Sequence, residues 1–513
     1  MNKYTLLSLI LALSFCFSAC EDQLDIAQHG VTGVDDYYKT DTDAEEAISD
    51  IYYRWQTHIL SFFYLTNFTS DDMYAGGNRR GANVPIEALS GFTFDASNTH
   101  IENVFTSLYQ MVYRANAILD NLEPTTARQK QVAAEAHFFR AWCYFYLTAL
   151  WGTPPLADHV LKSDEYTLPN TPTEELWAFV ESDLKGAISS GALAEKASVD
   201  DVQVRITKTA AQAMLGKVYV WEKKWSEARD MLDQVINSGK YDLFGGDYGE
   251  ILCSSTDFNC ENILEANFIK DAANTIYHGL YISIGWRGEF FSWVDNDCDV
   301  GTNGWGQANP RRDLYDAFVE REGKDGYRLT HTLWDYETVK SHGIYIKSGS
   351  SLEQHDGIFS WKLRFSPSDF NNSPYNSHAN LRYMRFAEVL LLAAEAHLQS
   401  GGSADKALEY VNRIRERAQL EPLSSVTMDD VKIEKRLELC YEGTRFMDLV
   451  RWGDAATELA DKDLKIGTFK SDGTWIPDAF SAGGGFKSGK HELLPFPTKE
   501  MTVNKQLTQN PGW

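Results

Sequence analysis

EKRLELCYEGTRFMDLVRWG, residues 434–453, carries the clearest structural pattern in this 513-residue chain. Apolar side chains recur at helical spacing on both sides of a glycine: Leu437, Cys440 and Tyr441 before it, and Phe446, Leu449 and Val450 after it. Spacing of three and four residues places such side chains on one face of a helix. The segment therefore predicts two helices that meet at Gly443.

Charged residues follow the same segment at a regular spacing. Glu442, Arg445, Asp448 and Arg451 are each three residues apart, and their signs alternate. Spacing alone would allow a solvated ladder of salt bridges, worth about 0.3–0.5 kcal/mol per pair. Because charged residues of this kind lie among apolar helical neighbours, internal ion pairs are the favoured interpretation. That interpretation covers the following residues: Arg140, Glu395, Arg436, Glu442 and Arg451.

Helices come in pairs along much of the chain, which predicts an all-α dominated fold. In residues 207–236, the tetratricopeptide pattern is filled by Leu215, Gly216, Tyr219, Ala228, Leu232 and Val235. A looser copy in residues 386–418 uses Ala394, Ala396, Ala407, Val411 and Ile414. Further helices are predicted at about 43–60, 100–122 and 131–152.

The helical pattern stops in two places. Residues 241–380 and 461–513 are rich in Gly, Asn, Asp and aromatic residues without a sustained period. We interpret the first as a loop-rich insertion with short strands near 343–348 and 359–365 and a helix near 311–320. Residues 20–513 then form one domain, with a helical scaffold at 40–240 and 381–460 and a loop-rich tail.

Composition and the N-terminus limit the partners and the location. A net charge of −25 provides no basic field for nucleic acid. Residues 1–19 have the organisation of a signal peptide, with Lys3, an apolar run, and small residues before Cys20. This arrangement resembles a bacterial lipobox, which would make Cys20 the lipidated first residue of the mature protein. The mature protein would be soluble but tethered.

The remaining cysteines predict no zinc site or nucleophile. Cys143 and Cys440 lie on apolar helix faces and are expected to be buried. Cys253 and Cys260 flank a short polar loop, and both a local disulfide and two free thiols fit the sequence. No cofactor is predicted. An oxygen-rich run, Asp295, Asn296, Asp297 and Asp299, fits either a calcium site or a solvated acidic loop.

Five segments, in this order, are similar to the SusD/RagB family of surface glycan-binding lipoproteins. They are residues 135–156, 381–397, 411–420, 434–453 and 493–513, the last reading LLPFPTKEMTVNKQLTQNPGW. The resemblance implies a tetratricopeptide-like helical fold with a glycan site on its loops. It also implies a lipid anchor in the outer membrane, facing the cell exterior, and a SusC-like TonB-dependent transporter as partner.

Glycan binding needs aromatic planes for sugar rings and polar groups for hydroxyls. Two regions supply both, and the resemblance supports the same regions. The first contributes Asp71, Asp72, Tyr74, Asn78 and Arg79, and the second contributes Trp286, Trp293 and Trp305, with Trp334 as a further candidate. The alternative is that a loop tryptophan caps a hydrophobic cluster beneath the loop.

Two other functions compete with glycan uptake. Tetratricopeptide-like pairs also bind peptides, so a peptide-binding uptake lipoprotein or an interaction scaffold fits the repeats. The aromatic, Asn-rich loops favour carbohydrate over peptide. A glycoside hydrolase would need a carboxylate pair at a defined separation, and no feature of the sequence selects one. We therefore expect a binding protein and not an enzyme.

Overall fold

The structure is a computed structural model that describes residues 37–271, 278–294, 298–301, 303–370, 373, 375–460, 462, 466–478 and 484–513. The predicted signal peptide and Cys20 lie outside the described residues, as do Asp295, Asn296 and Asp297. Helices dominate the described chain, as the sequence predicts, and the strands are short.

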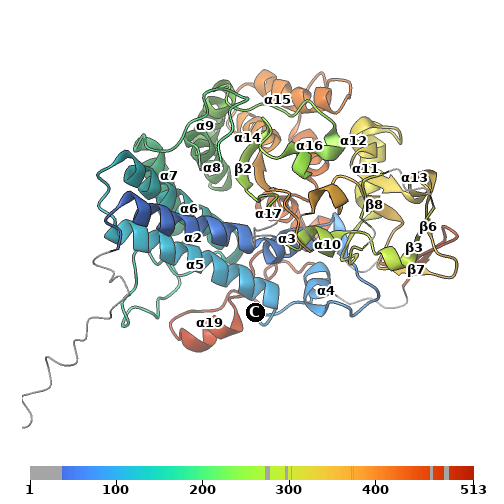
Figure 1. Cartoon of the computed structure of the whole chain (residues 1–513), viewed down its shortest axis with the longest axis horizontal. Coiled ribbons are helices and arrows are strands. Elements are labelled where there is room, and N and C mark those ends of the chain that lie inside the picture. The colour runs from blue at the N-terminus through green and yellow to red at the C-terminus, as the bar shows by residue number, and fades with distance from the viewer. Residues whose placement is uncertain are drawn as a thin grey trace, which may run out of the picture.

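The described N-terminal part of the chain is helical, with four long helices and two shorter ones. In chain order these are α2 (Asp41–Thr57), α3 (Ile59–Phe68), α4 (Val84–Ser90), α5 (Thr99–Asn121), α6 (Ala127–Trp151) and α7 (Thr173–Ser189). Figure 1 shows α2, α5, α6 and α7 side by side. α6 begins with a capping box in which Thr126 and Gln129 each accept a hydrogen bond from the other's backbone. Its second half, from Phe138 on, is buried on all sides, which explains why its apolar residues show no single stripe.

The two tetratricopeptide-like pairs predicted from the sequence are present. The first is α8 (Lys208–Trp221) with α9 (Trp225–Asn237), and the second is α14 (Phe386–Gln399) with α15 (Ala404–Arg417). α14 packs against α9, so the pairs stack although the insertion separates them in sequence. Close approach within the first pair depends on Gly216, because a Cβ there would lie 2.5 Å from the Leu232 side chain.

Residues 434–453 form two helices that meet where the sequence predicts. α16 (Met428–Leu439) ends before Cys440, and α17 (Arg445–Trp452) begins after Gly443. Gly443 has φ 76° and Tyr441 has φ 71°, so the chain turns through left-handed backbone between the helices. A short helix, α18 (Ala455–Glu458), follows.

The solvated ladder allowed by the spacing is wrong, because the charges point inward to distant partners. Arg445 pairs with Asp71 at 2.8 Å, and Arg451 pairs with Glu395 at 2.6 Å. Only Asp448 and Arg451 pair along the helix edge, at 2.8 Å. The internal ion pairs are confirmed for the five residues named above, whose partners are as follows: Asp183 for Arg140, Arg451 for Glu395, Asp71 and Asp72 for Arg436, Lys362 and Arg385 for Glu442, and Glu395 and Asp448 for Arg451.

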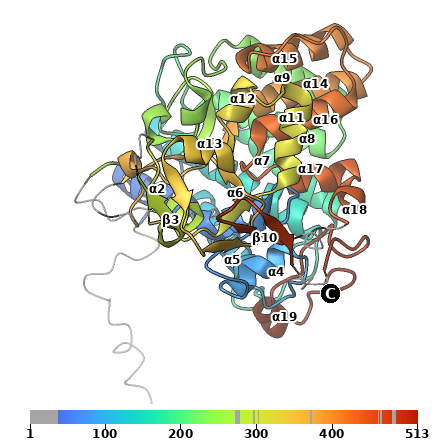
Figure 2. The same cartoon turned by 90° about the vertical axis from the view of Figure 1, so that its right-hand side faces the viewer.

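The insertion contributes strands to short antiparallel ribbons, two of which it forms with strands from outside its bounds, β1 (Met73–Ala75) and β9 (Leu381–Arg385). The pairs are β1 with β4 (Ala308–Pro310), β2 (Asn262–Ala266) with β9, β3 (Phe291–Trp293) with β6 (Ile344–Ile346), and β5 (Leu333–Asp335) with β8 (Ile358–Ser360). The tail adds β10 (Gly467–Lys470) and β11 (Trp475–Pro477) to β7 (Ser351–Glu353). Figure 2 views the molecule from the side of the insertion, and β3 and β10 are visible on that side.

Short helices connect these ribbons, and the insertion has its own core. The helices are α10 (Leu280–Ile284), α11 (Arg312–Glu322), α12 (Tyr327–Thr330) and α13 (Tyr336–Ser341); α19 (Thr498–Val503) lies near the C-terminus. The helix predicted near residues 311–320 is α11. Trp286, Trp334, Phe359 and Phe469 belong to a second hydrophobic cluster, separate from the main core of the scaffold.

Candidate functional site

The two loop regions singled out from the sequence are brought together by the β1–β4 ribbon. Tyr74 lies opposite Asn309 in this pair, and the Gly76 N–H donates to the Gln307 carbonyl at 2.9 Å. A Cβ at Gly76 would lie 2.2 Å from the Gly306 carbonyl oxygen, so glycine is needed where the loops touch. Loop 76–80 therefore lies against the described segments 284–294 and 303–307.

An open hollow of about 340 Å³ lies between these loops. Backbone and side chains of Gly77, Trp286, Arg287, Gly306 and Glu353 line it, among others. Arg287 donates to the Trp305 carbonyl at 3.2 Å, and Glu353 accepts from the Arg80 backbone N–H at 2.8 Å. Apolar walls with a few fixed polar groups are typical of small-molecule sites.

Trp305 directly precedes Gly306, which lines this hollow, and its carbonyl accepts the hydrogen bond from Arg287. Its side chain is 37% exposed, although its backbone N–H is held by the Ile282 carbonyl at 2.7 Å. Tyr375, 54% exposed, lies next to it, with ring centroids 6.1 Å apart and planes inclined by 57°. Such an inclined pair offers two aromatic faces to a ligand and keeps a phenolic hydroxyl at the rim. Asn78 and Arg79 are also exposed, on the neighbouring loop.

Three predicted ligand residues point away from this surface. Asp71 and Asp72 are buried and bind arginines of α16 and α17: Arg436 lies 3.0 Å from Asp71 and 2.9 Å from Asp72. Burial alone would raise the pKa of Asp71, but Arg436 and Arg445 hold it below its usual range. Burial raises the pKa of Asp72, and its neighbour Asp71 raises it further. These carboxylates anchor the start of the loop.

Tyr74 is buried as well, under the guanidinium of Arg311 at 4.9 Å from the ring centroid. With Asp71 and Asp72 it is not available to a ligand on the surface. The sequence showed a polar loop, but it did not show that α16 and α17 supply the partners for its first two acids.

The other candidate tryptophans form the second hydrophobic cluster. Trp286 is 8% exposed and stacks on the half-buried Trp293, with centroids 6.4 Å apart. Trp334 is buried between His342 and Trp361, at 4.5 and 4.1 Å. For these rings the structure favours the alternative interpretation, a cluster that supports the loops. Trp286 still reaches the floor of the hollow.

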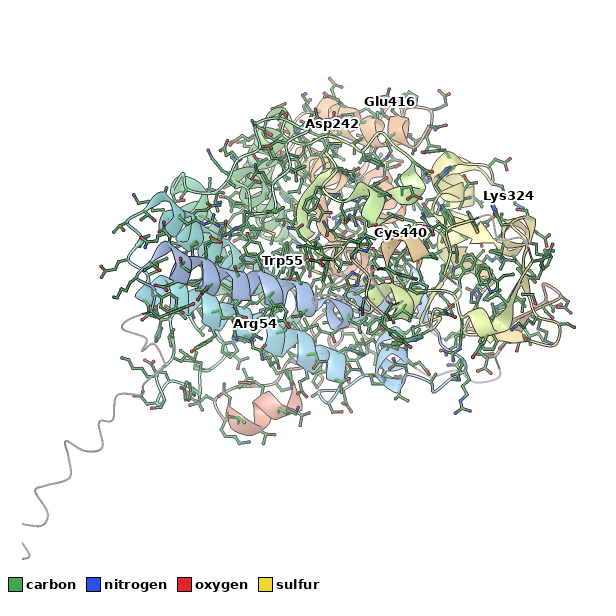
Figure 3. All side chains as sticks on the ribbon, viewed as in Figure 1. Arg54, Trp55, Asp242, Lys324, Glu416 and Cys440 are labelled. Atoms are coloured by element: carbon green, nitrogen blue, oxygen red, sulfur yellow. The ribbon has the colours of Figure 1, made fainter. Side chains whose placement is uncertain are left out.

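The possible disulfide between Cys253 and Cys260 does not form. Both are free thiols: Cys253 is buried, and Cys260 donates to the Leu243 carbonyl at 3.7 Å. Burial raises the pKa of both thiols. Cys143 and Cys440 are buried as predicted, and Figure 3 shows Cys440 well inside the molecule.

The structure describes only one residue of the possible calcium run. Asp299 accepts hydrogen bonds from Ser366 and, at 2.7 Å, from Ser368. Within the described ranges, no group of three His, Cys, Asp or Glu residues could hold a metal ion. In the same part of the chain, every helix is too short or too polar to cross a membrane.

Tyr375, Arg287 and Glu353 were not predicted. Tyr375 follows a proline in the polar segment NNSPYNS, which is a turn signal, and an aromatic residue in such a turn is a candidate for exposure. Glu353 and Arg287 carried no signal, because their position depends on strand pairing across the insertion.

Comparisons with known proteins identify similar chains along nearly the whole length. A family model described as "SusD family" matches residues 352–513, and one described as "Starch-binding associating with outer membrane" matches residues 35–220. "SusD-like protein P25" of Formosa agariphila is 24% identical over 530 residues, covering 96% of each chain. "Starch-binding protein SusD" of Bacteroides thetaiotaomicron is 24% identical, covering 84% of this chain and 82% of that protein.

Solved structures are similar in fold over the same length. A "Laminarin binding SusD-like protein" superposes with a TM-score of 0.78 at 26% identity, and the match covers 93% of this chain and 100% of the other.

Proposed function

Since this chain belongs to the SusD/RagB family, we propose that it binds a neutral oligosaccharide or polysaccharide on the surface formed by loop 76–80 and the segments 284–294 and 303–307. The observation that carries the proposal is the exposed, inclined ring pair of Trp305 and Tyr375, joined to the hollow through Gly306, the chain neighbour of Trp305. Sugar rings have apolar faces that stack on such rings, while Arg287, Glu353 and Asn78 are placed to meet hydroxyl groups.

The relatives indicate which ligands to try first. One similar protein is described as starch-binding and another as laminarin-binding. Both ligands are neutral glucans, which suits a chain whose net charge of −25 repels polyanions. Laminarin and starch are therefore the first ligands to test. Affinity should be modest, because ordering a flexible glycan offsets much of the stacking energy.

We further propose that the mature protein is held at the outer membrane by a lipid on Cys20 and passes glycan to a SusC-like TonB-dependent transporter. Support comes from the small residues before Cys20 and from the outer-membrane association in the description of the matching family model. Labelling with a fatty-acid probe should mark the wild-type protein and not Cys20→Ala. Purification from outer membranes should bring the transporter with it.

Binding without catalysis is the proposed role. The acidic group at the hollow, Glu353, is engaged by the Arg80 backbone, and the similar proteins are described as binders. Release of reducing sugar from laminarin or starch by the purified protein, above that of a heat-denatured sample, would contradict this.

A direct test uses the chain from residue 21 onward, which contains every described residue. Calorimetric titration with laminarin, starch oligosaccharides and a set of peptides should give binding to one glycan class and to no peptide. Trp305→Ala and Tyr375→Ala should each weaken that binding at least tenfold. Tyr53→Ala, which removes a ring of 46% exposure on α2, is the matched control.

A further inference from the structure

A second aromatic groove lies on the helical scaffold, between α5, the loop 152–172 and α19. It has an open volume of about 830 Å³. We call it the α5–α19 groove, and its principal lining residues are Tyr109, Tyr113, Tyr166, Leu168, Glu500 and Asn504. It shares no lining residue with the hollow between the loops. Figure 1 shows α19 beneath α5, well away from the ribbons of the insertion.

The walls of this groove are fixed by hydrogen bonds between its three segments. The Tyr109 hydroxyl donates to the Pro155 carbonyl at 2.6 Å, which ties α5 to the loop. The Asn504 amide donates to the Leu168 carbonyl at 2.7 Å, which ties the chain after α19 to the same loop. The groove is therefore preformed, and a ligand would not have to order it.

Two tyrosine rings that line this groove are exposed to solvent. Tyr113 is 56% exposed and Tyr166 is 63% exposed, which places them among the most exposed aromatic residues in the described chain. Leu161 and Leu168 add apolar surface to the lining of the groove. Exposed tyrosines gathered around one groove provide both flat faces and hydroxyl groups, as sugar recognition requires.

The charged groups of the groove are already engaged within the protein. Arg114 binds Asp50 and also donates to the Gln110 carbonyl at 3.0 Å. Burial raises the pKa of Glu500, whose carboxylate receives a hydrogen bond from Asn504. The cationic group of the groove, Arg114, is therefore already paired with an acid. The Gln110 side-chain oxygen accepts from Arg54 at 2.8 Å, so the remaining hydrogen-bonding capacity lies on the Gln110 amide nitrogen and on the exposed hydroxyls of Tyr113 and Tyr166. This combination favours a hydroxyl-rich ligand.

We propose that the α5–α19 groove is a second binding site for a neutral glycan, built on Tyr113 and Tyr166. This inference rests on the proposed function, because it assumes that glycan is the ligand of the loop surface. A polymer long enough to reach both sites binds the second one intramolecularly, at the effective concentration set by the intervening chain. A hexasaccharide bound at one site gains no such advantage.

Native gel electrophoresis through laminarin, and in parallel through starch, tests the proposal with the chain from residue 21 onward. Wild-type protein should be retarded by one of these polymers. The double variant Tyr113→Ala/Tyr166→Ala should lose about three- to tenfold in affinity for that polymer. Trp305→Ala should keep a weak retardation that disappears when the two tyrosine substitutions are added. Tyr53→Ala should migrate like wild type.

The outcomes separate this proposal from the proposed function. Retardation that is unchanged in the tyrosine double variant and abolished by Trp305→Ala alone would overturn the second site and leave the loop surface intact. No retardation of wild type in either polymer would overturn both. Titration with laminarihexaose or maltohexaose adds a second readout: two bound molecules per wild-type chain and one per double variant are expected. Equal melting temperatures verify that the exposed tyrosines can be replaced without unfolding.

Discussion

The helical scaffold and the loop-rich insertion differ in where their side chains point: charged side chains of the scaffold point inward, and two aromatic side chains of the insertion point outward. In the scaffold, the regular charges of residues 434–453 turn inward and bind arginines, lysines and acids of other elements. In the insertion, some aromatic rings join the main core and others form a small second core, but Trp305 and Tyr375 turn outward. The most regular sequence pattern therefore encodes stability, and the proposed recognition surface lies where the pattern is weakest.

The centre of the scaffold's charge network is Arg385. Its fully buried guanidinium binds Glu438 at 3.1 Å, Glu442 at 2.6 Å, and also Glu261. Several charges removed from water are tolerated only because each has partners. This network joins β9 to α16 and to the turn before α17, so it holds the second helix pair in place.

Removing Arg385 should have the largest effect on stability. Arg385→Met leaves three buried carboxylates without their central partner, and we expect a loss of about 3–5 kcal/mol in the free energy of unfolding. Urea denaturation measures it. Arg79→Ala, at an exposed arginine of the candidate site, should change stability by less than about 0.5 kcal/mol. If both variants lost the same free energy of unfolding, the proposed difference between the buried charges of the scaffold and the exposed charges of the candidate site would be wrong.

Acid should destabilise the scaffold through His58. Burial lowers the pKa of this ring to about 4, from an ordinary value of 6.5. Between these values the unfolded chain binds the proton and the folded chain does not, so stability falls as pH drops from 6.5 to 4, by up to about 3 kcal/mol for this group.

Comparison with His58→Phe isolates this contribution. The ring packs against Phe62 and Trp142, so phenylalanine suits its surroundings. Unfolding measured at pH 7 and pH 4.5 should show a smaller difference in the variant than in wild type. Identical pH dependence in both proteins would show that His58 is protonated in the folded state.

Close helix packing should be tested at Gly216. Gly216→Val adds atoms where a Cβ would already lie 2.5 Å from Leu232, and overpacking should cost about 1–3 kcal/mol. Gly186→Ala in α7 is the control: nothing lies within 4 Å of its added Cβ, so it should be neutral or stabilise by up to about 1 kcal/mol. Thermal melts of both variants suffice. A stable Gly216→Val protein would mean that α8 and α9 can separate without loss.

The smallest effect is expected at the cysteines of the insertion. Because Cys253 and Cys260 are free thiols, a reducing agent should leave the melting temperature unchanged. A thiol titration of the denatured protein should count both as reactive. A drop in melting temperature on reduction, absent in Cys260→Ser, would reveal a bond between them.

Much of the scaffold could be predicted from the sequence, because periodic burial fixes helices locally. The break at Gly443 and the pairing of α8 with α9 follow from glycine and small-residue positions. The ion-pair partners of the charged residues could not be predicted. Arg445, for example, binds Asp71, which lies 374 residues away in the chain. Spacing along one helix contains no information about such a partner.

The candidate site was predicted as a region but only partly as residues. Composition located the two loops, and Trp305 was among the residues named. Trp286 and Trp334 had the same sequence signature, a tryptophan among polar loop residues. They are buried because they pack against each other within the second hydrophobic cluster. Whether a loop ring faces inward depends on strand register across the insertion, which has no periodic signal.

Binding of laminarin and starch by the Trp305→Ala variant, with melting temperature measured on the same samples, tests the central claim most directly. We expect binding to fall at least tenfold while the melting temperature stays that of wild type, since the ring is exposed and outside the hydrophobic clusters. Wild-type glycan binding that survives in Trp305→Ala and in Tyr375→Ala would contradict the assignment of recognition to this surface.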